Sequence, residues 1–322
     1  MAKYVISRIM QMILTLFLIM TILFILLKIT PGSPFNNPKI TPALRMALEE
    51  KYGLDKPILV QYGIYLVNII RGDFGDSIIM MKNTPVTKMI ITPLQHTIRL
   101  GLISLFFGSI IGIFLGAIAA LNRNKFWDHF NTVIAVAGVS LPAFVIAMIL
   151  LILRRNFPFI PVVYQPSNPD LGITKWMELS SLTLPVLSLS FGVVASISRY
   201  MRTELVEIYN SDYILLARAK GLNTTQVFTK HAFRNALIPI VTIMGPMIVA
   251  LITGSTVIER FFGVPGLSLM TIKAINVKDT FVTLGCELLY SAMFVFAMLI
   301  VDLTYGIIDP RIRLVGGNSN VK

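Results

Sequence analysis

The chain has 322 residues, of which 55% are hydrophobic and only 14% charged, and its mean hydropathy is +0.76. This composition is far too apolar for an ordinary soluble domain and indicates a membrane protein. The formal net charge of +12 is spread over loops beside apolar runs. Such a distribution reports membrane topology and contact with anionic lipid, so we expect membrane lipid and no nucleic acid among the partners.

Six long stretches are almost free of charge, and each has about the 20 residues that cross a bilayer as a helix. They are Ile9–Leu27, Leu100–Asn122, His129–Leu153, Leu179–Ser198, Asn235–Ile258 and Phe281–Val301, the last interrupted only by Glu287. Only helices and closed β-barrels satisfy their backbone hydrogen bonds in lipid, and these stretches lack the alternating apolar and polar residues of barrel strands. The sequence therefore predicts an all-α polytopic membrane protein with six transmembrane helices. The first apolar run is longer than a signal-peptide core and no A-x-A site follows it, so we expect it to stay attached.

The distribution of Lys and Arg predicts that both termini are cytoplasmic. Thirteen basic residues then fall inside: Lys3, Arg8, Arg123, Lys125, the six from Arg199 to Arg234, Arg311, Arg313 and Lys322. Six fall in the two short outside loops: Arg154, Arg155, Lys175, Arg260, Lys273 and Lys278. The Arg154–Arg155 pair opposes this orientation but does not reverse the sum.

The segments between the first two spans are more organised than plain linkers. Prolines in Pro31–Pro38 break the first helix, and Thr41 can cap a short helix that starts at Pro42 and ends near Gly53. Pro57–Ile70 is apolar but too short to span, so we expect it in the interface or packed on the bundle. Two loops complete this outer rim, RGDFGDS (Arg71–Ser77) and the proline-rich Phe157–Asp170. These segments can serve as rigid connectors or form a docking surface, and the sequence leaves both possibilities open.

The stretch between the fourth and fifth spans predicts two helices joined by a glycine turn. Asn210, Ser211 and Asp212 are N-cap candidates for a helix over Tyr213–Lys220. Gly221 stands where a left-handed residue would end that helix. Asn223, with Gln226 three residues later, matches a capping box that starts the second helix.

One face of the first of these helices is made of small residues. Tyr213, Ala217 and Gly221 are spaced i, i+4 and i+8, so another backbone can approach them closely. This face suits docking into a groove on a partner. The alternative is a hairpin packed on its own membrane domain.

The segment SDYILLARAKGLNTTQVFTKHAFRNALIP (Ser211–Pro239) resembles the cytoplasmic "EAA" loop of binding-protein-dependent ABC importer permeases of the oligopeptide, dipeptide and nickel subfamily. The first, B-type permease of that subfamily is also similar over Ile6–Pro34, Arg71–Ser77, Val139–Phe144, Thr183–Tyr213, Val257–Ser268 and Val301–Arg313. Leu215 and Leu216 replace the first two positions of the general loop pattern, which puts a role for its glutamate in doubt.

The resemblance implies the transmembrane domain of a type I ABC importer in a bacterial cytoplasmic membrane. Residues 1–30 then form the first transmembrane helix and residues 31–97 an extracytoplasmic segment with short helices. Residues 98–307 form the core permease domain, with five transmembrane helices and the coupling loop 199–234, and residues 308–322 a cytoplasmic tail.

The resemblance also implies the partners: a second homologous permease, an extracytoplasmic substrate-binding protein and two cytoplasmic ATPase subunits that carry ATP and Mg. No glycine in the chain is followed by lysine, which excludes a phosphate-binding P-loop, so we expect a non-catalytic subunit without a cofactor. The histidines show no ligand spacing, and we expect no metal site. The ATPase-coupling residues implied by the loop are Tyr213, Ala217, Ala219, Lys220, Gly221 and Leu222.

Glu287 stands inside the sixth span, where a charge costs about 2.5 to 3.5 kcal/mol on insertion scales. It can face a substrate pathway, or it can snorkel or pair with a basic residue. The expected substrate is an oligopeptide or dipeptide, with nickel or a metal chelate as the alternative. An ion-coupled transporter or channel would also show six spans, but that function does not explain the presence of the loop at Ser211–Pro239.

Overall fold

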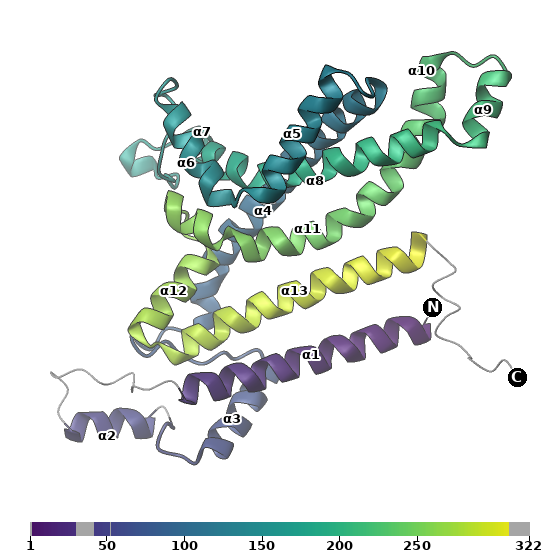
Figure 1. Ribbon diagram of the computed structural model, residues 1–322. Coiled ribbons are helices and arrows are strands. Elements are labelled where there is room, and N and C mark those ends of the chain that lie inside the picture. The colour runs from purple at the N-terminus through teal and green to yellow at the C-terminus, as the bar shows by residue number, and fades with distance from the viewer. Residues whose placement is uncertain (1, 30–41, 52, 309–322) are drawn as a thin grey trace, which may run out of the picture. The chain divides into compact units, whose positions relative to one another are not determined.

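The computed structural model describes residues 2–29, 42–51 and 53–308, which form helices joined by turns (Figure 1). Apart from helices, the described residues pair only in two isolated β-bridges, Asp76 with Pro85 and Asn168 with Ile173. The helices are α1 (Ala2–Ile29), α2 (Pro42–Lys51), α3 (Ile58–Ile70), α4 (Val86–Leu121), α5 (Phe126–Ser140), α6 (Ala143–Arg154), α7 (Lys175–Ser181), α8 (Thr183–Tyr209), α9 (Asp212–Ala219), α10 (Thr224–Gln226), α11 (Phe233–Phe262), α12 (Leu267–Val277) and α13 (Thr280–Ile308), with a 3-10 turn at Pro169–Leu171 and a π-helix at Val227–Ala232. The all-α prediction is confirmed.

Helices occupy all six predicted spans, but they do not form six continuous ones. Within the described residues, α1, α4, α8 and α13 are long and apolar enough to cross a membrane, and α5 with α6 passes the same test only as a pair. The fifth predicted span coincides with α11, a helix of 30 residues that contains Pro239 and Pro246.

The prediction of one unbroken span over His129–Leu153 is wrong. The helix stops at Ser140, restarts at Ala143, and the axes of its two parts differ by 117°. Leu141 is extended, with φ −95° and ψ 124°, because the ring of Pro142 disfavours a helical residue before it. The pair is therefore a broken span or a re-entrant segment.

Several predictions for the segment after the first span can be compared with the structure. The break at Pro31–Pro38, the cap at Thr41 and the tail beyond residue 308 lie outside the described residues. The short helix α2 begins at Pro42 and ends before Gly53, as predicted. The turn Arg71–Ser77 is punctuated by two glycines with positive φ, as its sequence indicates.

By their internal contacts the residues fall into two compact units. The first comprises residues 1–8, 98–264 and 296–322, and the second comprises residues 9–97 and 265–295. Each has its own buried apolar core.

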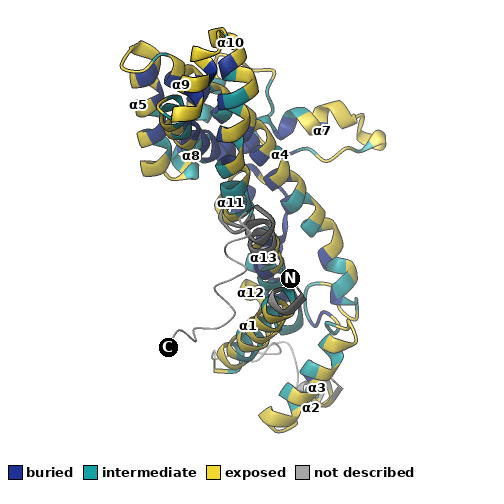
Figure 2. Cartoon of the chain, turned by 90° about the vertical axis from the view of Figure 1, so that its right-hand side faces the viewer, coloured by how far each residue is buried: buried dark blue, intermediate teal, exposed yellow. Residues whose placement is uncertain are grey.

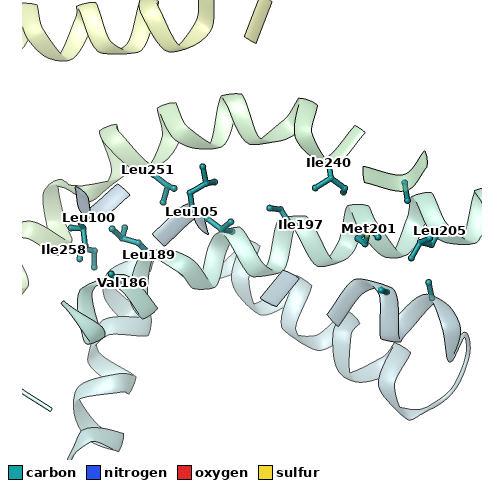
Figure 3. Packing of buried hydrophobic residues seen from close by; sticks show 14 of the residues in the cluster. Leu100, Leu105, Val186, Leu189, Ile197, Met201, Leu205, Ile240, Leu251 and Ile258 are labelled. Atoms are coloured by element: carbon teal, nitrogen blue, oxygen red, sulfur yellow. The ribbon is translucent and has the colours of Figure 1, made fainter. Parts of the chain in front are cut away.

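In the first unit α8 is the central helix and packs against α5, α6 and α11. Figure 3 shows Ile197 of α8 beside Ile240 of α11, in a core to which α4 contributes Leu105. Apolar side chains on α8 therefore face neighbours on more than one side, which explains why this helix is more buried than the other long helices. The arrangement gives the loop that follows α8 a rigid base.

An ion pair joins the start of α5 to α8 in the same unit. Arg202 donates from Nε to Oδ1 of Asp128 at 2.6 Å and from Nη2 to Oδ2 at 2.8 Å. Asp128 also accepts the amide of Asn124 at 2.8 Å. The bidentate geometry makes this a strong charge-assisted contact, and it fixes the α4–α5 turn against the end of α8 that precedes α9.

In the second unit a buried carboxylate fastens the segment after the RGDFGDS turn. Asp279 accepts the hydroxyl of Ser77 at 2.7 Å and the amides of Ile79 and Met80 at 2.9 and 3.0 Å. Side chain and backbone donors thus compensate the desolvation of this charge. The contact ties the loop before α4 to the junction of α12 and α13.

The short apolar helix α3 packs on α1 in the second unit. Tyr65 is buried, and its ring centroid lies 5.7 Å from that of Phe24. The hydroxyls of Tyr62 and Thr21 lie 2.5 Å apart. Other apolar residues of α3, among them Leu59 and Ile70, are exposed. Helix packing was one of the two expected placements for this segment.

Candidate functional site

The turn after α8 folds into the hairpin that its sequence predicts. Helix α9 starts after Ser211 and ends at Ala219, and Gly221 follows with φ +84°. The amide of Leu222 donates to the carbonyl of Ala217 at 3.3 Å and closes the turn. Ser211 occupies the N-cap position, but its hydroxyl donates to the carbonyl of Ile208 and does not cap α9.

The second arm of the hairpin begins with a complete capping box. The amide of Gln226 donates to Oδ1 of Asn223 at 2.8 Å, and the amide of Asn223 donates to Oε1 of Gln226 at 3.1 Å. The chain then passes through the π-helix Val227–Ala232 into α11 without a break. The pattern of hydrophobic residues does not distinguish a π-helical turn from an α-helical one, so the sequence did not predict this π-helix.

Part of the small face of α9 lies against the chain's own core, which is one of the two placements expected for this helix. Ala217 is only 6% exposed and packs into the chain's own core with Ile214 and Val227. Ala217 itself is therefore not open to another backbone. Burial of this face also explains why the hairpin holds its position on the first unit.

Among the other predicted coupling residues, Ala219, Lys220 and Gly221 are exposed, and no atom lies within 4 Å of a Cβ built on Gly221. Leu222 is half-buried against the core. Tyr213 is exposed, and its hydroxyl accepts a hydrogen bond from Nδ2 of Asn235 at 3.2 Å.

Two leucines that were not predicted as coupling residues form the open apolar surface of the hairpin. Leu215 is 68% exposed and Leu216 56% exposed, on the outer side of α9, much of which is drawn as exposed in Figure 2. They replace the first two residues of the general loop pattern. That replacement was the available signal, because an apolar pair on a short helix requires either the core or a partner protein to cover it.

At the loop after α6, a polar network holds the proline-rich segment Phe157–Asp170. The hydroxyl of Tyr164 donates to Oε1 of Glu178 at 2.9 Å, and Arg99 forms an ion pair with the same oxygen. The amide of Tyr164 donates to the carbonyl of Phe262 at 2.8 Å. The loop is therefore a fixed surface element of the first unit.

The same network shifts the pKa values of its members. Burial raises the pKa of the Glu178 carboxyl, but hydrogen bonds from Tyr164, Ser167 and Arg99 outweigh it, and the net shift is downward from 4.5. Burial and the neighbouring Glu178 raise the pKa of the Tyr164 phenol.

This network predicts acid sensitivity. A carboxyl with a depressed pKa in the folded state contributes stability above its unfolded pKa, and that stability is lost as pH falls through the folded pKa. We expect the melting temperature of the full-length chain in detergent to fall as pH drops below about 4.5. Glu178→Gln should be less stable than the natural chain at pH 7 and lose less on acidification. Asp170→Asn, an exposed change in the same loop, is the matched control, and an equally flattened profile in that variant would contradict the assignment.

Glu287 lies on α13 with its side chain half-buried. Within the described residues no Lys, Arg or His forms an ion pair with it. Its backbone carbonyl accepts the hydroxyl of Ser291 at 2.8 Å. No group of three or more His, Cys, Asp or Glu residues comes together as a metal site in the described ranges.

Comparison with known proteins places the chain in a family. The family model described as "Binding-protein-dependent transport system inner membrane component" matches residues 112–314, and the model of its N-terminal part matches residues 1–91. The dipeptide transport system permease protein DppB of Lactococcus lactis is 39% identical over 98% of this chain and 100% of its own length. The oligopeptide transport system permease protein OppB of Haemophilus influenzae is 36% identical over 97% of this chain and 100% of its own length.

The fold has a counterpart among solved structures. A chain of the MetNI methionine ABC transporter, solved in inward-facing conformations, superimposes with a TM-score of 0.54 at 17% sequence identity. The match covers 69% of this chain and 97% of that one. At this identity the likeness concerns the fold, which is that of a type I ABC importer transmembrane domain.

Both family models and the near full-length similarity agree with the resemblance carried by the Ser211–Pro239 hairpin. The chain is a permease subunit without catalytic activity, and it belongs to the family of binding-protein-dependent transport system inner membrane components.

Proposed function

We propose that this chain is one of two permease subunits of an ATP-driven importer for dipeptides or oligopeptides. The observation that carries the substrate class is similarity over almost the whole chain to permeases named for dipeptide and oligopeptide transport. The second permease is a homologous chain, and an extracytoplasmic binding protein delivers the peptide. Both termini and the hairpin after α8 lie on the cytoplasmic side, which the excess of Lys and Arg in those segments supports.

The hairpin is the proposed contact for two ATPase subunits, which carry the ATP and Mg that this chain does not bind. Its stiffness comes from the Asn223–Gln226 capping box and from the buried anchor at Ala217. Its contact surface comprises Leu215, Leu216 and the exposed residues from Ala219 to Gly221. A stiff element with an apolar outer surface can transmit the closing of the ATPases to α8 and α11 as a rigid-body movement.

The function is tested with the full-length chain and the subunits that co-purify with it. We expect an ATPase pair and a second permease in the purified complex, and vanadate-sensitive uptake of a labelled dipeptide into vesicles that contain it. Uptake that continues at full rate without the ATPases would assign the chain to ion-coupled transport or to a channel. ATP-dependent uptake of nickel, without uptake of peptide, would show that nickel is the substrate.

Glu287 is the proposed contact on the pathway for the ammonium group of a peptide. A half-buried carboxylate on a transmembrane helix, with no ion pair in the described part of the chain, can accept a charge-assisted hydrogen bond. Such a bond contributes about 1.5 kcal/mol, so Glu287→Gln should reduce uptake of a free dipeptide about tenfold. Uptake of an N-acetylated dipeptide should change much less. An equal effect, or none, on both peptides would remove Glu287 from the pathway.

A further inference from the structure

A basic recess opens at the end of α8, between that helix, the end of α4 and the hairpin. It has a volume of about 240 Å3, and it is lined by Arg123 and Thr224, by Tyr209 and Asn210, by Arg218 and by an apolar wall that includes Val206. No acidic residue lines it. All these residues belong to the first unit, so the recess does not depend on the placement of the second.

The two arginines of the recess come from different segments of the chain. Arg123 follows α4, and Arg218 projects from the last turn of α9, with its guanidinium carbon 5.7 Å from the ring centroid of Tyr209. Neither takes part in the ion pairs recorded for the described residues. Guanidinium groups bind anions such as phosphate through directed pairs of hydrogen bonds. Two arginines that line one recess are therefore suited to bind such an anion.

A second, independent observation points to a missing partner. The hydroxyl oxygen of Tyr209 is buried, and it has no hydrogen-bond partner. A buried unsatisfied hydroxyl is costly, and native structures usually provide it with a partner. Tyr209 lines the recess, so a rotation of its side chain that turns the buried hydroxyl toward a ligand oxygen between the two arginines would give this hydroxyl an acceptor.

The surroundings of the recess indicate the source of that oxygen. Phe126, Trp127 and Phe130 begin three residues after Arg123, and all three are exposed, at 71%, 47% and 41%. Their ring centroids lie 5.6 to 6.2 Å apart, so they form one cluster. Exposed aromatic clusters beside a membrane helix mark the depth of the lipid headgroups. The turn that carries Arg123 is therefore at headgroup level.

We propose that this recess binds the phosphate of an anionic phospholipid, held by Arg123 and Arg218 and by the hydroxyl of Tyr209. The lipid would join the end of α4 to α9, so that the hairpin is held by the membrane surface as well as by its own core. The inference concerns lipid binding and does not depend on the transported substrate or on the ATPases.

The test uses the full-length chain purified in detergent, with dioleoylphosphatidylglycerol as probe and dioleoylphosphatidylcholine as neutral comparison. Native mass spectrometry measures the lipid retained at increasing concentration. We expect selective retention of phosphatidylglycerol, and about fivefold weaker binding in Arg123→Ala and in Arg218→Ala, since each basic residue at the surface contributes about 1 kcal/mol. Tyr209→Phe should weaken binding by a similar factor, because it removes one hydrogen bond to a charged group.

Two controls separate the recess from general effects. Lys125→Ala removes the same charge from the same turn but does not line the recess, so its binding should stay close to that of the natural chain. Tyr209→Phe removes only an unpartnered hydroxyl, so its melting temperature in lipid-free detergent should not fall.

Three results would overturn the proposal. Equal losses in Lys125→Ala and Arg123→Ala would mean diffuse attraction to the surface. Binding of inorganic phosphate that displaces the lipid would mean a site for free phosphate. Unchanged lipid binding in all recess variants, together with loss of co-purifying ATPase, would mean that a carboxylate of a partner protein occupies the recess.

Discussion

Replacing Leu215 and Leu216 together by aspartate is expected to prevent stable association with the ATPase subunits and to abolish uptake. The two side chains are 68% and 56% exposed, and they form the apolar surface of α9. Burying a leucine contributes about 1.5 to 3 kcal/mol, so losing both should weaken association at least a hundredfold. The fold should remain, because neither side chain belongs to the buried core.

The measurement is co-purification of the ATPases with the variant permease, followed by ATPase activity and peptide uptake in reconstituted vesicles. Thr203→Asp with Thr225→Asp adds the same two charges at exposed positions outside α9, and it should leave association near normal. Gly221→Asp should act in the same direction as the leucine variant, because it adds a charge beside this surface and places a non-glycine residue at φ +84°. Normal assembly and transport in the leucine variant would exclude α9 as the ATPase contact.

Introducing a single methyl group at Gly116 or Gly138 is expected to destabilise the first unit. A Cβ at Gly116 would lie 2.5 Å from the carbonyl oxygen of Ser198 and 2.7 Å from Cβ of Met201. At Gly138 it would lie 2.2 Å from Cβ of Ala195. Real Cβ atoms do not come this close to other heavy atoms, so α4 or α5 would have to move away from α8.

Overpacking of this kind typically costs about 1 to 3 kcal/mol. Gly101→Ala and Gly192→Ala provide matched controls, since the nearest atom to a Cβ at either position is 3.9 Å away. These two should be neutral, or stabilised by up to about 1 kcal/mol, because alanine favours helix. Thermal unfolding of the purified chains in one detergent gives the comparison. Four glycine variants of equal stability would show that α8 does not pack as closely as the structure indicates.

Much of the hairpin follows from local signals. Gly221 ends α9 because only glycine adopts a left-handed conformation without steric cost, and Asn223 with Gln226 starts the next helix through bonds that span three residues. These interactions involve neighbours in the chain, so a sequence pattern is enough to predict them. The helical class is local in the same sense, because lipid requires each span to satisfy its own backbone.

Contacts between side chains that are far apart in the sequence could not be predicted in this way. Period and spacing identified Tyr213, Ala217 and Gly221 as one face of a helix, but not which face the rest of the protein would bury. Ala217 is buried in the core, whereas Leu215 and Leu216 are exposed. Similarly, no pattern pairs Arg99 with Glu178 across 79 positions of the chain.

The sequence by itself therefore determined the membrane class, the approximate helices, the turn at Gly221 and the family, because each depends on composition or on residues close together in the chain. Pro142 is a local signal for a helix break, but only the tertiary structure decided the 117° angle between α5 and α6, the inward face of α9 and the basic recess between Arg123 and Arg218. Those features depend on which surfaces pack together, and packing is settled among segments that are distant in sequence.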